Sequence, residues 1–251
     1  MARRTFVIGD IHGELGHLGL LLGKLPALDA EDTLVLLGDY LDRGPRSAEV
    51  VHRIRSLEHE LPCRVVCLRG NHEDGWLRAI DHGWPGFLLP RSNGCLETVR
   101  SFDGREPPRD EELPGPLDID RMERGAFFPP EVVAWMRSLP TWYEDEHAIY
   151  VHAGLEHRGG RFLHPSESEA NVAHLWTRSE AFFRDYRGKR VVVGHTVTEL
   201  LPPELSAYTP ADPTDLWAGP AVVAIDTGCG VGGFLTAVEL PAERVYESRS
   251  T

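Results

Sequence analysis

Short apolar runs in this sequence repeatedly end in glycine followed by a carboxylate, an amide or an imidazole. The polar residues placed in this way are Asp10, His12, Asp39, Asn71, His72, His152 and His195. One such residue alone is most often a turn former or a hydrogen-bonded histidine. Together they provide two carboxylates, one carboxamide and several imidazoles without a thiolate. This donor set is typical of a site for divalent cations, so the sequence predicts a metal centre.

The spacing of these residues fits two metal ions. Asp10 and His12 are two positions apart in a loop bracketed by glycines, so both can reach one cation. Asp39 can bridge two cations with a single carboxylate. The residues expected to complete the coordination shell of the second ion are Asn71, His152 and His195. Mn²⁺ is the expected metal, with Fe, Zn, Co and Ni as alternatives. Two close ions can ionise a bridging water and direct it at phosphorus, which predicts hydrolysis of a phosphate ester or phosphoanhydride.

Such a reaction also needs groups that bind phosphate oxygens and protonate the leaving oxygen. Arg43 and Arg69 stand beside the metal motifs, and a guanidinium binds phosphate oxygens bidentately. A salt bridge to a helix is the alternative role of Arg69. His72 is the candidate acid, and Asp42 is expected to hold its other ring nitrogen and raise its pKa.

The elements that must position these groups alternate between strands and helices in the first 82 residues. Apolar runs predict strands at 5–8, 33–37 and 64–68, and helices over 14–24 and 47–60, the second with Ser47 as its N-cap. This is the rhythm of a βαβαβ unit. Open α/β sheets carry their sites at the carboxyl ends of the strands, so we expect the polar residues at one edge of one sheet.

The second half of the chain is predicted to be rich in strands. A hairpin is expected at 142–151 with a turn at 145–146, and further strands at 190–193, 221–225 and 234–240. Between residues 83 and 130 the periodicity loosens, and 105–116 is charged and rich in proline. We interpret 83–130 as a variable loop or cap region that overhangs the site, within a single domain over 1–251.

Composition and charge limit the class of protein. Hydrophobic residues make up 41% of the 251 residues, and the formal net charge is −13. That charge repels nucleic-acid backbones and anionic lipid, so bulk binding to either is not expected. No apolar run is long enough to cross a bilayer, and the N-terminal apolar stretch is too short for a signal peptide, which predicts a cytoplasmic protein. The four cysteines are expected to be buried thiols. The oligomeric state is left open.

Five ordered motifs resemble those of the phosphoprotein phosphatase family of calcineurin-like metallophosphoesterases. The motifs are Gly9–Gly13, Gly38–Gly44, Gly70–Glu73, His152–Gly154 and Gly194–His195. The resemblance implies an α/β metallophosphatase fold, with a central β-sandwich flanked by helices and a binuclear metal site at the carboxyl ends of the strands. It implies that Asp10, His12 and Asp39 bind one metal. It assigns Asp39, Asn71, His152 and His195 to the other.

The same resemblance extends to the remaining site residues. It implies that His72 and Asp42 form the acid pair and that Arg43 binds phosphate. The segment Leu175–Arg178 resembles one that supplies a second phosphate-binding arginine in small bacterial and phage members, so Arg178 is a further candidate. A charge on a helix surface is its alternative role. Asn93 and Gly94 resemble a segment often found near the site of the family.

Two substrate classes follow from the resemblance. Asp42 and Glu73 are typical of the protein-phosphatase branch, which favours a small bacterial-type serine/threonine protein phosphatase acting on phosphoproteins. The glycine-rich turn 225–233 resembles one in dinucleotide hydrolases, so the alternative is a hydrolase of dinucleoside polyphosphates or RNA caps. A catalytically inactive scaffold that binds phosphoproteins is a third hypothesis. It is disfavoured because no ligand or acid is missing.

Overall fold

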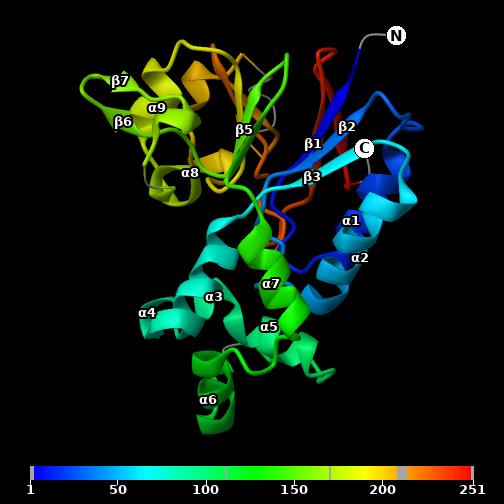
Figure 1. Cartoon of the computed structure of the whole chain (residues 1–251), viewed down its shortest axis with the longest axis vertical. Coiled ribbons are helices and arrows are strands. Elements are labelled where there is room, and N and C mark those ends of the chain that lie inside the picture. Colours follow the sequence, from blue (N-terminus) through cyan, green and yellow to red (C-terminus); the bar gives the residue numbers. More distant parts are fainter. Residues whose placement is uncertain (1–2, 111, 170, 208–213, 250–251) are drawn as a thin grey trace.

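The structure, a computed structural model, describes residues 3–110, 112–169, 171–207 and 214–249. Two five-stranded sheets lie against each other in the upper half of the molecule, and a group of helices lies below them (Figure 1). The polar residues predicted to form the site follow the strands of these two sheets.

The first sheet contains the predicted βαβαβ unit. Its strand order is β12-β11-β1-β2-β3, and β1, β2 and β3 are parallel. The helices α1 (Leu15–Lys24) and α2 (Ser47–Glu60) connect them. The strands are β1 (Thr5–Ile8), β2 (Thr33–Leu36), β3 (Arg64–Cys67), β11 (Thr236–Leu240) and β12 (Arg244–Glu247). Strand β11 pairs antiparallel with the free side of β1, and β12 pairs antiparallel with β11.

The second sheet is built from the second half of the chain. Its strand order is β4-β5-β8-β10-β9, with β5, β8 and β10 parallel and the two outer strands antiparallel. The strands are β4 (Trp142–Glu144), β5 (Ile149–Val151), β8 (Val191–Val193), β9 (Trp217–Ala218) and β10 (Val222–Ala224). The hairpin predicted at 142–151 is confirmed. The Asp145 carboxylate accepts hydrogen bonds from the backbone N–H groups of His147 and Ala148 in the turn.

Side chains alternate along the strands of the first sheet, so one set packs against the helices and the other packs between the two sheets. Phe6 and Ile8 point toward α1 and α2, whereas Val7 between them packs with Tyr150 and Val223 of the second sheet. The two sheets therefore pack face to face, and the predicted β-sandwich flanked by helices is confirmed. The outer face of the second sheet is covered by α9 (Glu180–Asp185).

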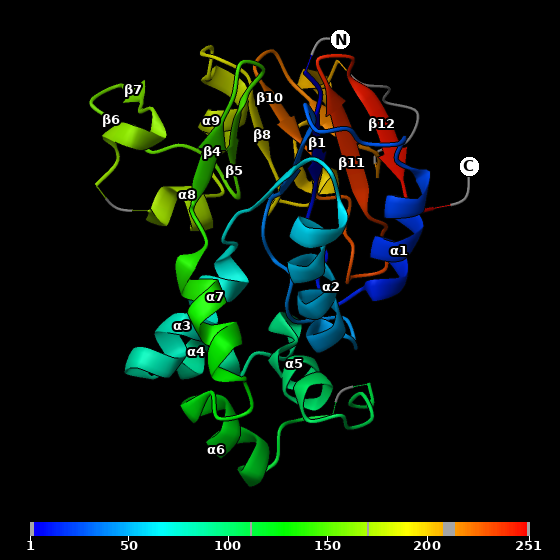
Figure 2. The same ribbon diagram turned by 45° about the vertical axis from the view of Figure 1, so that its right-hand side comes forward.

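The region 83–130 was expected to be irregular, but much of it is helical. It contains α4 (Pro85–Leu88), a 3₁₀ turn at Arg91–Asn93, α5 (Cys95–Phe102) and α6 (Pro116–Arg124). These helices pack with α3 (Asn71–His82) and α7 (Pro130–Ser138) around the buried Trp76. Helices α5 and α6 are short and are separated by the charged, proline-rich residues 105–116, so each shows its helical period over only two or three turns. Figure 2 shows this helical group below both sheets.

Smaller elements complete the fold. A short hairpin pairs β6 (His157–Arg158) with β7 (Arg161–Phe162), and α8 (Val172–Trp176) follows it. Single 3₁₀ turns lie at Pro165–Glu167, Thr198–Leu200 and Pro203–Leu205. Within the described ranges, no helix has the length and apolar character needed to span a membrane.

One predicted helix start is wrong. Ser47 is the first residue of α2 and Arg46 takes the N-cap position. The Ser47 hydroxyl instead accepts a hydrogen bond from the backbone N–H of Asp42 and contacts the hydroxyl of Thr98. Ser47 therefore stabilises the loop that carries Asp42 and does not cap the helix.

Candidate metal centre

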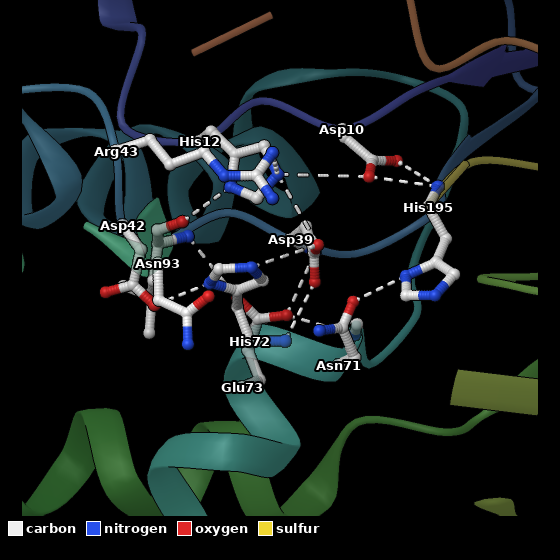
Figure 3. Close-up of polar contacts among 12 residues, drawn as sticks. Asp10, His12, Asp39, Asp42, Arg43, Asn71, His72, Glu73, Asn93 and His195 are labelled. Atoms are coloured by element: carbon white, nitrogen blue, oxygen red, sulfur yellow. Dashed lines mark hydrogen bonds and ion pairs between the residues drawn. The ribbon is translucent and has the colours of Figure 1, made fainter. Parts of the chain in front are cut away.

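The predicted ligands converge at the ends of strands from both sheets, and not from one sheet as expected. Asp10, Asp39 and Asn71 follow β1, β2 and β3, whereas His152 and His195 follow β5 and β8. Figure 3 shows Asp39 between His12 and Asn71, with His195 on the Asn71 side. The carboxyl ends of the parallel strands of both sheets open onto one region, because the sheets are stacked with these ends together.

The backbone is strained where the site residues stand. Six non-glycine residues of the described chain have a positive φ, and five of them are the site residues His12, Asp39, Asp42, Arg43 and His195. Positive φ is unfavourable for such residues and is concentrated at functional sites. Close backbone approach adds a further constraint, since a Cβ on Gly194 would lie 2.0 Å from Oδ1 of Asp10.

A first group of candidate ligands surrounds His12. Its Nε2 atom lies 3.4 Å from Oδ2 of Asp39 and 4.0 Å from Oδ2 of Asp10. The other ring nitrogen, Nδ1, donates a hydrogen bond to the Leu41 carbonyl at 2.9 Å. This contact fixes the tautomer and leaves Nε2 with a lone pair, and carbonyls orient metal-binding histidines in the same way.

A second group surrounds Asn71. His152 donates from Nδ1 to the Leu37 carbonyl at 3.1 Å, so its Nε2 atom is an acceptor. That acceptor faces another acceptor, Oδ1 of Asn71, at 2.9 Å, and Oδ1 of Asp39 at 3.4 Å. His195 brings Nδ1 to 2.7 Å from the same Asn71 oxygen. The facing lone pairs of His152 and Asn71 have no proton between them and repel each other, and a cation removes that repulsion.

Asp39 belongs to both groups. Its Oδ2 atom lies nearest His12 and its Oδ1 atom nearest His152, both at 3.4 Å. Sets of three ligand atoms that could hold an ion form on each side, one with His12, Asp39 and His72, the other with Asp39, His152 and His195. This is the arrangement that a carboxylate bridging two metals requires.

The protonation states match those of metal ligands. Burial is the main cause that lowers the pKa of His12, His152 and His195, so each imidazole is neutral. Burial acts to raise the pKa of Asp39, but the positive charge that its carboxylate meets on a protonated His152, His72 or His12 outweighs burial and lowers that pKa. The pKa of Asp10 is raised, first by burial and then by the charges of Asp226 and Asp39. Crowded buried carboxylates and neutral imidazoles form a donor set that fits divalent cations.

The predicted acid pair is formed. Nδ1 of His72 lies 2.7 Å from Oδ2 of Asp42. Asp42 is fully buried and also accepts hydrogen bonds from Nε1 of Trp76 at 2.9 Å and from the hydroxyl of Thr98 at 2.6 Å. Burial acts to lower the pKa of His72, but the charge of Asp39 and the hydrogen bond to Asp42 outweigh it and raise that pKa. His72 can therefore carry a proton beside the candidate metal ligands.

The three candidate arginines lie in different surroundings. Nη1 of Arg43 donates to Nε2 of His12 at 2.8 Å, so this guanidinium is at the centre. Arg178 is exposed just beyond the end of α8, and its charge ranks after burial and the charge of His152 among the causes that lower the pKa of His195. Arg69 is not brought to the cluster. Its side chain donates to the carbonyl of Arg137 at 2.6 Å, near the end of α7.

Two buried carboxylates of the site were not predicted as site residues. Asp226 follows β10, and its Oδ2 atom has no hydrogen-bond partner in the part of the chain that the structure describes. Burial is the main cause that raises its pKa, to about 6. Glu73 accepts hydrogen bonds from the backbone N–H groups of Asp39, Tyr40 and Gly70. Asp226 repeats the pattern of a polar residue after an apolar run, a signal already present in the sequence.

Asn93, which was singled out without a role, lies at the end of the 3₁₀ turn that precedes α5. Its side-chain amide donates to the carbonyl of Phe87 at 2.8 Å, and the Phe87 ring packs edge-on against His72 at 5.6 Å. Its neighbour Gly94 accepts a hydrogen bond from the backbone N–H of Arg43 at 3.3 Å. This turn therefore supports the loop with Arg43 and the ring beside His72.

Comparison with known proteins gives relatives of two kinds. The chain is 26% identical, over an alignment 291 positions long, to the symmetrical bis(5'-nucleosyl)-tetraphosphatase of Aromatoleum aromaticum, covering 96% of this chain and 95% of the relative. For the protein of the same name from Janthinobacterium, the identity is 26% over 151 residues, and the match covers 60% of this chain and 43% of the relative. The serine/threonine-protein phosphatase rdgC of Drosophila melanogaster is 34% identical over 92 residues, which cover 34% of this chain and 14% of rdgC. The chain thus spans less than half the length of two of these three relatives.

Solved structures and family comparison agree on the fold. The crystal structure of a putative diadenosine tetraphosphatase superposes with a TM-score of 0.55 at 21% identity, covering 97% of this chain and 92% of that one. The sequence pattern of the calcineurin-like phosphoesterase family matches residues 3–199, more than half of the chain. The chain therefore belongs to the calcineurin-like phosphoesterase family.

Proposed function

We propose that this protein is a metal-dependent serine/threonine protein phosphatase that hydrolyses phosphate monoesters. The observation that carries this proposal is the buried pair of His72 and Asp42, with Nδ1 of His72 2.7 Å from Oδ2 of Asp42. The alkoxide of serine or threonine is a poor leaving group and needs a proton from an acid. A nucleoside diphosphate leaves as a stable anion and depends far less on such a proton.

The metal ligands in this proposal are those predicted from the sequence. Asp10, His12 and Asp39 hold one divalent cation, and Asp39, Asn71, His152 and His195 hold the other, with Mn²⁺ as the expected metal. When bound, two such cations lower the pKa of a water molecule and neutralise charge on the phosphoryl group. Asp226 lies close enough to Asp10 for its charge to raise the pKa of that carboxyl, so it adds to the negative charge that favours cations here.

The side chains around the metals have separate tasks. His72 gives its proton from Nε2 to the leaving oxygen, while Asp42 orients the ring through Nδ1 and stabilises its charged form. Arg43 binds phosphate oxygens, and Arg178 supplies a second guanidinium. Arg69 is left out of this proposal, because its guanidinium is engaged by the Arg137 carbonyl.

Hydrolysis of dinucleoside polyphosphates or RNA caps is the second candidate. It is favoured by the relative from Aromatoleum aromaticum, which matches nearly the full length of both chains and is named a symmetrical tetraphosphatase. The same metal centre can serve both reactions, so the difference lies in how much the reaction needs the acid pair.

A competitive turnover panel separates the two candidates. The Mn²⁺-loaded protein is assayed with phosphoserine and phosphothreonine peptides, p-nitrophenyl phosphate and diadenosine tetraphosphate. We expect higher kcat/KM on the phosphopeptides than on the dinucleotide. Faster conversion of diadenosine tetraphosphate to ADP alone would support the second candidate, and no turnover of any ester with Mn²⁺, Co²⁺, Ni²⁺ or Zn²⁺ would refute both.

A further inference from the structure

Arg178 is an exposed residue on a short connection, yet that connection is tied to the metal centre. Helix α8 ends at Trp176, Thr177 is extended, and Arg178 precedes α9. Arg178 and Thr196, the neighbour of His195, line a surface cavity of about 640 Å³. An exposed arginine with a free connection would lose much conformational entropy on binding phosphate. The contacts of Trp176 and Thr177 therefore decide how much conformational freedom Arg178 has before it binds phosphate.

The first tie is made by Trp176. Its indole Nε1 donates a hydrogen bond to Oδ2 of Asp74 at 2.8 Å. Asp74 lies in the first turn of α3, three residues after Asn71, and is 8% exposed. Nε of Arg78 reaches the same oxygen at 2.7 Å, and its guanidinium lies 5.9 Å from the centre of a Trp176 ring. This hydrogen bond joins α8 to the helix that carries Asn71 and His72.

The second tie runs to the loop after β5. The backbone N–H of Ala153, next to His152, donates to the carbonyl of His174 at 2.7 Å. A Cβ added to Gly154 would lie 2.7 Å from the methyl group of Thr177 and 3.2 Å from the ring of Phe182. The connection thus packs directly on the chain beside a candidate metal ligand.

We propose that Asp74 and Trp176 are positioning residues that hold Arg178 where it binds the phosphoryl group. This inference rests on the proposed function, and specifically on Arg178 as a phosphate ligand. Two residues of extended chain span only about 7 Å, so fixing Trp176 restricts the space open to the Arg178 backbone. The hydrogen bond to a charged acceptor on α3 makes that restraint directional.

The test uses Trp176→Phe, which removes the indole N–H and keeps an aromatic ring, and Asp74→Asn. The matched control is Asp81→Asn, because Asp81 lies on the same helix α3 and also pairs with an arginine, Arg137 of α7, at 2.8 Å. Calorimetry measures the affinity of the Mn²⁺-loaded protein for inorganic phosphate. Steady-state kinetics on p-nitrophenyl phosphate separates KM from kcat, and hydrogen exchange follows the amides of 172–178.

We expect Trp176→Phe and Asp74→Asn each to weaken phosphate binding and raise KM about tenfold, the effect of roughly one lost hydrogen bond, with a smaller change in kcat. Exchange in 172–178 should become faster in both variants, whereas Asp81→Asn should behave as wild type. In an Arg178→Ala background, Trp176→Phe should add no further loss of phosphate affinity.

Two results would overturn the inference. One is wild-type phosphate affinity in both Trp176→Phe and Asp74→Asn, while Arg178→Ala binds phosphate weakly. The other is an undiminished effect of Trp176→Phe in the Arg178→Ala background. Failure of the proposed function is a separate result, namely a wild-type protein that hydrolyses no ester. In that case calorimetry and hydrogen exchange would still show whether Asp74 and Trp176 position Arg178.

Discussion

The acid pair shows how single residues acquire a role from their surroundings. His72 and Asp42 lie 30 positions apart, and their contact depends on Trp76 and Thr98, which hold the Asp42 carboxylate from two further sides. A carboxylate that accepts a hydrogen bond from an imidazole raises the pKa of that imidazole. His72 is thereby distinguished from His12, His152 and His195, whose pKa values are lowered mainly by burial.

Replacement of His72 by Asn should separate acid catalysis from metal binding. We expect kcat to fall by about 10²–10⁴ on alkyl phosphates, whose leaving groups need a proton, and to fall less on p-nitrophenyl phosphate. Metal content, measured by elemental analysis, should stay at the wild-type value. An equal loss on every leaving group would argue against the acid role, and Asp42→Asn serves as the companion variant because it leaves the imidazole in place.

At the scale of elements, the glycine-rich turn between β10 and β11 supports the first metal motif. Gly230 has a φ of +84°, and a Cβ there would lie 2.5 Å from Cβ of His12 and 3.3 Å from Cβ of Arg43. The thiol of Cys229 contacts the Ile11 carbonyl at 3.4 Å. The turn thus packs against the loop that carries Asp10 and His12, although more than 200 residues separate them.

Two glycines of this turn provide a matched pair of variants. Gly230→Ala and Gly232→Ala both place a Cβ at a positive φ, which costs about 1–2 kcal/mol. Only Gly230→Ala also meets His12, since a Cβ at Gly232 has no atom within 4 Å. We expect Gly230→Ala to lose about 1–3 kcal/mol more in denaturant unfolding, by overpacking, and to bind less metal. Equal stability and equal metal content in the two variants would contradict this packing role.

At the scale of the whole molecule, the centre joins parts that the sequence keeps apart. Its residues come from the first sheet, the second sheet and the first turn of α3, and Asp39 contacts partners from all three. The Thr5 hydroxyl donates to Asp145 at 2.6 Å, which adds a link between the sheets away from the centre. We therefore propose, as expected from the sequence, that the chain forms a single domain.

Metal binding should stabilise this domain as one unit. We expect a single thermal transition for the metal-free protein, followed alike by tryptophan fluorescence and circular dichroism. Mn²⁺ at about 100 times its Kd should add about 2.7 kcal/mol and raise Tm. Asp39→Asn should lose most of that increase because the bridging carboxylate is removed. A full Mn²⁺ shift in Asp39→Asn would place the metal elsewhere, and two separate transitions would contradict the single domain.

Much of the fold and the centre could be predicted from local sequence. Apolar runs identified the parallel strands of both sheets, because a strand buried on both faces is apolar at every position. The outer strands β9 and β12 were not predicted. The motifs after those runs identified a phosphoesterase of the calcineurin-like family, which the family match confirms. The sequence also brought together Asp10, His12, Asp39, Asn71, His152 and His195 as one ligand set. Each of these residues follows an apolar strand in the chain, and local sequence can show that feature.

Contacts between distant segments were decided only by the tertiary structure. Short apolar strands look alike wherever they pair, so the sequence did not show that the ligands follow two sheets. The helices of 83–130 are held by packing around Trp76, which local periodicity does not record. For the same reason Arg69, which is next to a metal motif, donates to the Arg137 carbonyl. Asp226 instead lies among the site residues, and Asp74 accepts the hydrogen bond of Trp176. Local sequence fixes which groups are available, and long-range packing selects the partners that each of them meets.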